Sequence, residues 1–409
     1  MSVRERVRRH TDMPRDVLVL GLIAFFVALG FGVLVPVLPS FAAHFGANDF
    51  MVGLVVSTFA AMRLATSPLC GRILARLGGR ATLASGVLIV AASSSIMAFA
   101  TNYWWLLGWR AVGGIGSAMF TVSAMTLLLA SVPADMRGRA TGFYQSGFLI
   151  GGMAGPALGG LLARIALVAP FHFYAITLAA AGATGLLLLS TTTTRAADPG
   201  TSATARPLRE VLGDARFQAA CTANLAQGWN SVGVRNSLIP LVIVAGLGLT
   251  PTWTGIVFAV AAVVQTLALA PVGRFVDTVG RRPAMLASGA LMAVALMGVP
   301  LSHSIWPLMG LMCVYAIGAA AMGTAPAASV GDATGGVRGG TPVAIFSMSS
   351  DLGAIVGPLV AGALSDHFGR TWGFSVGAVL LALSSLMAVR MPRAEVGHRR
   401  NPKAEPAQG

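Results

Sequence analysis

Charged side chains interrupt the apolar runs of this sequence at only a few positions. Arg63, Arg110, Arg235 and Asp351 each stand among residues that are mostly apolar. Low-dielectric surroundings favour the neutral form of a carboxyl group, so Asp351 is placed to take up and release a proton. A charged group inside an apolar helix is costly to insert and is a functional candidate for that reason. We therefore predict that Asp351 and Arg110 take part in proton coupling.

Both residues also have a structural interpretation. Arg110 could pin its helix to neighbouring carbonyl groups. Asp351 could pair with Arg72 or Arg76 as a latch near one membrane surface. The residues alone leave these interpretations open beside the functional one.

Further polar side chains predict a substrate cavity. Within residues 217–245, three polar residues spaced by three roughly share one helix face, and two more follow them. Such a face is too polar to contact lipid. The predicted lining residues are Arg63, Asn224, Gln227, Asn230, Arg235, Asn236 and Gln265. For Arg235 the alternative is snorkelling to the outer membrane surface. Three membrane arginines against one acid lead to the hypothesis of a neutral, amphiphilic or anionic substrate.

The composition places the chain in a membrane. Of its 409 residues, 55% are hydrophobic and 10% are charged, against about 25% charged in soluble proteins. These figures exclude a soluble enzyme, a disordered tail protein and a nucleic-acid binder. The net charge of +14 comes from short arginine clusters between apolar runs. We expect no cofactor and no metal site, because the cysteines and histidines show no paired-ligand spacing.

Apolar runs long enough to cross a bilayer follow one another along the sequence. They predict an all-α integral membrane protein with twelve transmembrane helices. The expected spans are 17–39, 51–70, 83–101, 104–131, 142–166, 171–191, 217–245, 253–272, 285–302, 306–328, 342–364 and 373–392. A stretch rich in Ala, Thr, Pro and Arg divides them into an N-terminal six-helix bundle (1–190), a cytoplasmic linker (191–216) and a C-terminal six-helix bundle with a short cytoplasmic tail (217–409).

Basic residues sort to one side of this topology. Twelve spans put both termini on the same side, and most of the 28 Lys and Arg residues fall there. The positive-inside rule then places both termini in the cytoplasm. Richness in Arg and Ala suggests a bacterium of high GC content, and hence its cytoplasmic (inner) membrane.

Residues recur along the chain at an offset of 202. Gly53 matches Gly255, and Gly155-Pro156 matches Gly357-Pro358. Other matches join Gly71-Arg72 to Gly273-Arg274, Gly78 to Gly280, Arg80 to Arg282, Gly151 to Gly353 and Gly160 to Gly362. Since 202 residues contain six predicted helices, the halves are parallel repeats. Such repeats predict a substrate site between them at mid-membrane.

A glycine- and arginine-rich connection follows the second and the eighth span. The copy from Gly273 to Arg282 reads GRFVDTVGRR, and the copy from Gly71 to Arg80 reads GRILARLGGR. The former resembles the cytoplasmic loop motif G-x-x-x-D-x-x-G-R-R of the major facilitator superfamily, which helps to latch the two halves closed. The resemblance implies gating roles for Gly71, Arg72, Arg76, Gly78, Arg80, Gly273, Asp277, Gly280, Arg281 and Arg282. Ala75 stands where the first copy of the motif usually has its acid.

Two further motifs carry the resemblance. Arg110 and Gly113 lie in a segment similar to the family's R-x-x-Q-G motif, with Gly113 in place of Gln. The fifth span resembles the motif of the drug–proton antiporter branch through Gly142, Gly151, Gly155, Pro156, Gly159 and Gly160. Glycines spaced by four permit close helix approach, and Pro156 kinks the helix.

The residues and the resemblance together predict a secondary transporter with the major facilitator fold. We expect proton-coupled efflux of a small organic molecule, drug-like or a metabolite, by alternating access. The expected partners are the substrate, protons and the lipid bilayer, without nucleic acid, and the chain is expected to be a monomer and not an enzyme. One alternative is a proton symporter or facilitator that imports a small nutrient. Another is a transport-deficient membrane sensor or partner protein.

Overall fold

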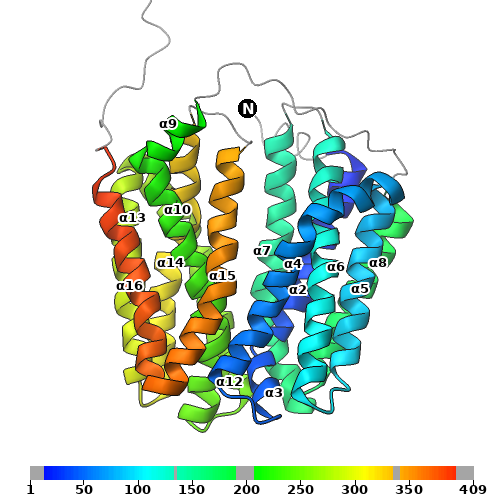
Figure 1. The fold of residues 1–409 in the computed structure, drawn as a ribbon, viewed down its shortest axis with the longest axis horizontal. Helices are drawn as coiled ribbons and strands as arrows, with labels where there is room; N and C mark the ends of the chain where they lie inside the picture. The colour runs from blue at the N-terminus through cyan, green and yellow to red at the C-terminus, as the bar shows by residue number, and fades with distance from the viewer. Residues whose placement is uncertain (1–12, 133–135, 190–206, 335–340, 393–409) are drawn as a thin grey trace, which may run out of the picture.

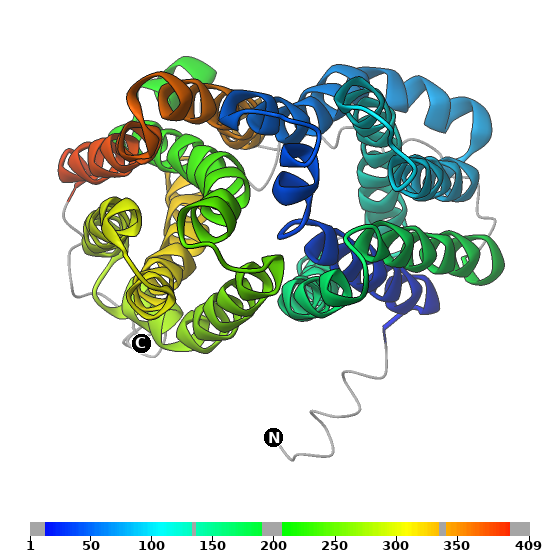
Figure 2. The same ribbon diagram turned by 90° about the horizontal axis from the view of Figure 1, so that it is seen from below.

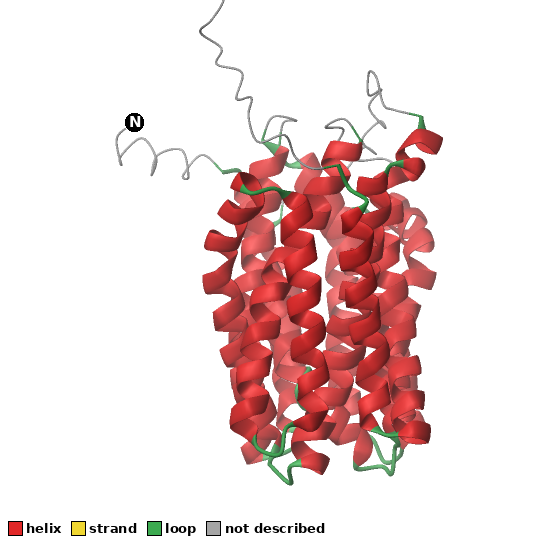
Figure 3. Cartoon of the chain, turned by 90° about the vertical axis from the view of Figure 1, so that its left-hand side faces the viewer, coloured by secondary structure: helices red, strands yellow, loops and turns green. Residues whose placement is uncertain are grey.

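Two bundles of long helices lie side by side in the computed structural model, which describes residues 13–132, 136–189, 207–334 and 341–392 (Figure 1). The view along the helices separates the bundles clearly (Figure 2). All regular structure in the described residues is helical (Figure 3). The predicted all-α membrane architecture is confirmed.

The first bundle comprises α2 (Arg15–Leu34), α3 (Leu38–Ala43), α4 (Asp49–Leu77), α5 (Gly79–Met97), α6 (Tyr103–Ala130), α7 (Arg137–Ile165) and α8 (Ala169–Leu188). The second comprises α9 (Leu208–Gly213), α10 (Ala215–Gly228), η1 (Trp229–Leu238), α11 (Ile239–Leu241), η2 (Val242–Gly246), α12 (Pro251–Thr278), α13 (Arg281–Gly298), η3 (Val299–Leu301), α14 (Ile305–Ala333), α15 (Thr341–Phe368) and α16 (Arg370–Val389). We call the end that carries α9 and the start of α2 the linker side, and the end that carries α3 the far side (Figure 1).

Eleven helices in the described parts of the chain are each long and apolar enough to cross a membrane. The seventh expected span, 217–245, is instead a composite of α10, η1, α11 and η2 in direct succession. The two η segments are π-helical, with more residues in each turn than an α-helix has. The composite runs from Ala215 to Gly246 and supplies the twelfth crossing.

The first expected span was wrong at its outer end. A single helix was expected over 17–39, but α2 ends at Leu34 and α3 begins only at Leu38. Pro36 accounts for the break, because a proline has no backbone N–H to donate to the preceding turn and its ring crowds the carbonyl group of that turn.

Two other expected spans were too short. Spans 51–70 and 253–272 continue as helix to Leu77 and Thr278. The connections that follow them are tight turns at Gly78 and Gly280, where φ is 78° and 113°. Glycine adopts such positive φ values without strain, which explains why both copies of the repeat carry it there.

Packing inside one bundle repeats in the other. In the first, α2 contacts α7 and α8, while α5 contacts α6 and α8. In the second, α10 contacts α15 and α16, while α13 contacts α14 and α16. Between the bundles, α4 packs on α15 and α12 packs on α7. The two parallel six-helix repeats are thereby confirmed. The exact domain bounds stay predictions, since residues 190–206 of the expected linker region lie outside the described residues.

Glycines bring α7 against α2 with backbone touching backbone. A Cβ at Gly151 would meet the carbonyl oxygen of Phe25 at 2.4 Å. The repeat-related position in α15 behaves alike, because a Cβ at Gly353 would meet the carbonyl oxygen of Leu225 at 2.2 Å. Three further glycines of α7 are packed as tightly on α2: Gly147, Gly155 and Gly159. The glycine spacing therefore serves close helix packing in both bundles.

Two seams close the far side between the bundles. In the α4–α15 seam, a Cβ at Gly53 would lie 2.2 Å from the carbonyl oxygen of Pro358. In the α7–α12 seam, a Cβ at Gly255 would lie 2.5 Å from the carbonyl oxygen of Pro156. The four residues are related in pairs by the offset of 202, so the sequence repeat marks the places where the bundles touch.

One added methyl group tests the packing of α7 on α2. Gly151→Ala should lower the melting temperature of the purified protein, because overpacking of this kind costs about 1–3 kcal/mol. Gly142→Ala on the same helix is the matched control, since no atom lies within 4 Å of its Cβ position. That control should leave the melting temperature unchanged or raise it slightly. Thermal unfolding followed by tryptophan fluorescence in lipid nanodiscs measures both, and equal melting temperatures would contradict the packing.

Candidate functional site

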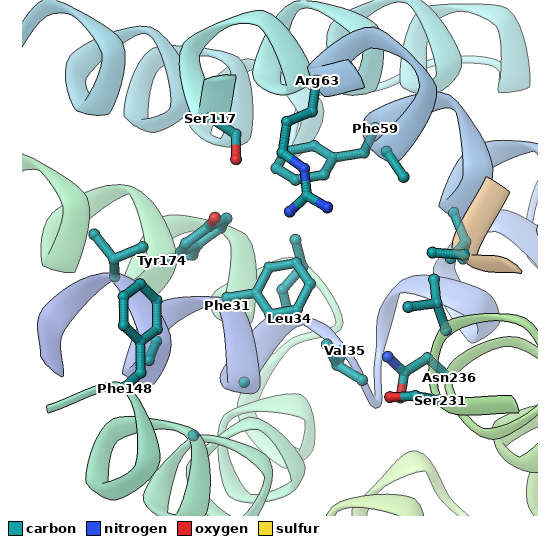
Figure 4. Close-up of a pocket in the computed structure, with 18 of the residues that line it drawn as sticks. Phe31, Leu34, Val35, Phe59, Arg63, Ser117, Phe148, Tyr174, Ser231 and Asn236 are labelled. Atoms are coloured by element: carbon teal, nitrogen blue, oxygen red, sulfur yellow. The ribbon is translucent and has the colours of Figure 1, made fainter. Parts of the chain in front are cut away.

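A cavity of about 630 Å³ lies between the two bundles. Arg63 and Asn236 point into it from opposite bundles (Figure 4). Its lining consists of Val27, Ala28, Phe31, Gly32, Leu34, Val35, Leu38, Val56, Phe59, Ala60, Arg63, Arg110, Ser117, Phe120, Thr121, Met125, Tyr144, Gln145, Phe148, Gly152, Pro156, Tyr174, Ser231, Val232, Arg235, Asn236, Phe258 and Ala354. Sites for small organic molecules usually have about 300–1,000 Å³ and a mostly apolar lining. The cavity therefore suits a small, largely apolar organic molecule.

The cavity is closed on the far side and reaches toward the linker side. Its lining includes Met125 near the end of α6 and Gln145 near the start of α7, both toward the linker side. Gly71 and Gly273, near the linker-side ends of α4 and α12, have no atom within 4 Å of a Cβ position. The bundles thus touch at the far side and stand apart at the linker side.

An ion pair joins the bundles beside this cavity. Nη2 of Arg63 in α4 donates to Oδ1 of Asp351 in α15 at 2.9 Å. The side chains are 36% and 32% exposed, so the pair is accessible to a ligand or a proton. A latch from Asp351 to Arg72 or Arg76 was the wrong alternative, because Arg63 lies more than two helical turns deeper in α4. Arg72 and Arg76 are exposed and have no acidic partner among the described residues.

Arg110 lines the cavity from α6 and is only 4% exposed. Its Cζ lies 4.3 Å from the centroid of the Phe59 ring. Its Nε has no hydrogen-bond partner among the described residues. The alternative of a pin to carbonyl groups is therefore unsupported for this nitrogen.

Arg235 lines the same cavity from η1 in the other bundle. Its Cζ lies 5.1 Å from the centroid of the Phe258 ring, and its Nε also lacks a partner among the described residues. Snorkelling to the membrane surface was the wrong alternative, since the side chain points to the protein interior. Asn236, its neighbour, lines the cavity as expected.

Four of the expected lining residues do not line the cavity. Asn224 donates to the carbonyl oxygen of Phe346 at 2.6 Å and so binds α15. Asn230 is fully buried and donates to the carbonyl oxygen of Gly377 in α16 at 3.1 Å. Gln227 and Gln265 are half-buried elsewhere. The prediction from the spacing of three failed because α10 packs on α15 and α16, and Asn224 and Asn230 bind those helices.

The residues expected in gating loops lie mostly in helix ends. Gly71, Arg72 and Arg76 belong to α4, and Gly273 and Asp277 belong to α12. Arg80 lies in α5, and Arg281 and Arg282 begin α13. Gly78 and Gly280 alone form the turns.

One of these arginines has a partner inside its own bundle. Arg281 pairs with Asp332 of α14. The gating role expected of Arg281 stays a prediction, since the linker side is open in this conformation.

A contact that the sequence did not reveal ties the far-side ends of the bundles. Asp366, at the end of α15, accepts hydrogen bonds from the backbone N–H groups of Asp49 and Phe50, both at 2.9 Å. The carboxylate thereby caps the first turn of α4, where N–H groups lack partners inside the helix. Ser365 contacts the Asp49 carboxylate beside it.

Within the described residues, no group of three or more His, Cys, Asp or Glu side chains could hold a metal ion. The three cysteines are free, and Cys70 is buried. The chemistry that this site offers is therefore charge, hydrogen bonding and an apolar surface.

Removing the charge of Asp366 should loosen the far-side closure. Charge-assisted hydrogen bonds contribute about 1.5–3 kcal/mol each, so Asp366→Asn should populate a form with the far-side ends apart. Spin labels at W104C and W306C report it, because both tryptophans are exposed at far-side helix starts of different bundles. The background carries serine for Cys70, Cys221 and Cys313.

Asp214→Asn is the matched control, since Asp214 caps its own helix α10 by accepting the N–H of Arg216 at 2.8 Å. We expect a longer label distance in Asp366→Asn and the native distance in the control. An unchanged distribution in both variants would remove Asp366 from the closure.

Comparisons with known proteins extend over much of the chain. Over 168 residues it is 32% identical to the tetracycline resistance protein, class H, of Pasteurella multocida, covering 40% of this chain and 42% of that protein. Over 193 residues it is 28% identical to the quinolone resistance protein NorA of Staphylococcus aureus (strain MRSA252), covering 47% of this chain and 48% of that protein. The chain thus spans less than half the length of these curated relatives.

A solved structure and a family profile match nearly the whole chain. The crystal structure of a bacterial homolog of the human lysosomal transporter Spinster, inward-facing and occupied, matches with a TM-score of 0.67 at 17% identity over 91% of this chain and 95% of that one. This likeness shows a common fold. The sequence profile of the Major Facilitator Superfamily matches residues 20–234 and 228–408. The chain is a multi-pass membrane protein that belongs to the Major Facilitator Superfamily of transporters.

Proposed function

We propose that this transporter exports a small organic molecule in exchange for protons. The observation that carries the proposal is the Arg63–Asp351 ion pair, which ties α4 to α15 beside the cavity. The Arg281–Asp332 pair, by contrast, lies within the second bundle. A proton on Asp351 removes the negative charge from this tie. Proton binding is thereby coupled to the relative movement of the bundles.

Alternating access follows from the way the bundles touch. In the present conformation the glycine seams hold the far side closed and the cavity reaches toward the linker side. Rocking of the bundles about the cavity would open the far side and close the linker side. Substrate enters from the linker side, leaves at the far side, and protonation of Asp351 permits the return.

Export is the direction that the relatives and the glycine motif favour. The two relatives described above are named for resistance to tetracycline and to quinolones. The glycines of α7 match the motif of the antiporter branch and pack as a tight face on α2. A smooth face of this kind lets one helix slide on another while a route stays sealed.

The arginine clusters orient the chain in its membrane. Arg72, Arg76, Arg80, Arg139 and Arg274 all lie at linker-side helix ends. We infer from the positive-inside rule that the linker side and both termini face the cytoplasm of a bacterial cell. We propose that the protein acts there as a monomer, since the two bundles of a single chain enclose the cavity between them.

Co-transport with protons is the second candidate, and the cavity charge favours it. All charged residues that line the cavity in the described chain are arginines. Protonation of Asp351 would release Arg63 and add to this positive charge. A ligand that Arg63 attracts would then bind together with the proton.

Proton movement in inside-out membrane vesicles tests the proposal. The vesicles carry a respiration-driven pH gradient, which a pH-sensitive dye reports, and receive a panel of antibiotics, dyes and organic acids. We expect a substrate of the panel to collapse the gradient with the native chain and not with Asp351→Asn. Asp332→Asn is the matched control, because it removes an acid that pairs with an arginine inside one bundle.

Each outcome of this experiment has one meaning. Collapse with Asp351→Asn as well would keep the exchange and return Asp351 to a structural role. Substrate-dependent proton movement in the opposite direction would establish co-transport. No response to any compound, with the protein present in the membrane, would contradict the export proposal.

A further inference from the structure

Two arginines in the cavity have no protein partner for their charge. Arg110 comes from α6 of the first bundle and Arg235 from η1 of the second, and both line the cavity. Neither forms a salt bridge among the described residues, and the Nε atom of each is buried without an acceptor. Arg63 differs, because Asp351 holds it. The two unpartnered arginines therefore line the same cavity from different bundles.

The aromatic neighbours do not balance these charges. Guanidinium groups stay protonated in proteins, so both side chains carry a full positive charge. Cation–π contacts such as those with Phe59 and Phe258 are weaker than an ion pair that has lost its water. A buried guanidinium without an acidic partner is consequently a site for an anion that comes from outside the chain.

The geometry of the guanidinium group indicates which class of anion it binds. A guanidinium presents parallel N–H donors that match the two oxygens of a carboxylate. The remaining lining is largely apolar, with Phe31, Phe120 and Phe148 among its rings. The two unpartnered arginines, with no lining acid in the described chain, would repel a cationic ligand at short range.

We propose that the cavity binds organic anions with an aromatic or otherwise apolar body and a carboxylate, which Arg110 and Arg235 hold between the bundles. The proposal names the substrate class and rests on the proposed transport function. It also gives substrate binding a mechanical effect. Two like charges on opposite bundles repel each other, and an anion between them replaces this repulsion by attraction to both.

Equilibrium binding to the native full-length chain in lipid nanodiscs tests the proposal, with empty nanodiscs subtracted. The probes are 2-naphthoate, 4-biphenylcarboxylate and 9-anthroate, each beside its neutral amide and its aminomethyl cation. We expect each carboxylate to bind at least tenfold tighter than its amide and its cation. Absent carboxylate binding, or affinities that do not follow charge, would overturn the proposal.

Variants assign the charge to its residues. Arg110→Gln and Arg235→Gln should each weaken carboxylate binding at least tenfold, and the lysine variants should restore part of it because they keep the charge and lose the paired donors. Arg164→Gln is the matched control, since Arg164 is exposed on α7 and lies outside the cavity lining. Equal affinities in native protein and both glutamine variants would contradict the assignment.

The affinity order of the probes, the glutamine variants and the proton-gradient experiment can each fail independently of the others. The order of affinities in the native protein decides the charge preference even where a glutamine variant does not fold. The binding is measured without a proton gradient, so its failure leaves the export proposal intact. Failure of the Asp351→Asn experiment in turn leaves anion binding intact.

Discussion

Close contact between backbones at glycine is the constraint on which this transporter depends. The bundles meet at the far side where a side chain is missing, at Gly53 against Pro358 and at Gly255 against Pro156. A methyl group at either glycine would lie within van der Waals distance of a carbonyl oxygen, so no other residue permits the same approach. Because the two contacts are related by the sequence repeat, one duplicated feature builds both halves of the closure. The cavity exists on the other side of these contacts because the helices diverge from them toward the linker side.

The two seams are related by the repeat in their glycine contacts but not in their charged residues. Arg63 and Asp351 form the ion pair of the α4–α15 seam, while the offset of 202 relates them to Gln265 and Leu149 in the α7–α12 seam. Asp366, which caps α4, corresponds to Arg164, and this reverses the sign of the charge. The α4–α15 seam therefore combines packing with groups that respond to protons and charge. The α7–α12 seam retains the packing, with polar contacts such as Thr252 to the carbonyl oxygen of Gly160 at 2.9 Å.

Sequence patterns predicted the fold well because they do not depend on side-chain packing. The length of the apolar runs and the placement of the arginines reflect the membrane, and the repeat reflects the two bundles. They also placed Arg63, Arg235 and Asn236, which line the cavity, because polar residues in apolar helices have few other places to go. They failed where helix rotation decides the outcome. Asn230, the second residue of η1, donates to the carbonyl oxygen of Gly377 in α16 instead of lining the cavity. The Asp351–Arg63 pair and the Asp366 cap join residues 288 and 317 positions apart, and only the assembled bundles bring them together.

The place where an anion binds decides how it is coupled to protons. If an anion took Arg63 from Asp351, it would strip the carboxylate of its positive partner and favour protonation. Linkage is reciprocal, so proton and anion would then bind together and move in the same direction. An anion held by Arg110 and Arg235 leaves the Arg63–Asp351 pair intact. It crosses with Asp351 still charged, and the return takes place with Asp351 protonated and the pair broken. The anion then binds to Arg110 and Arg235, and the proton binds to Asp351. Exchange of substrate for protons is therefore possible even for a negatively charged substrate. Which arginine holds the anion therefore determines the direction in which the proton moves.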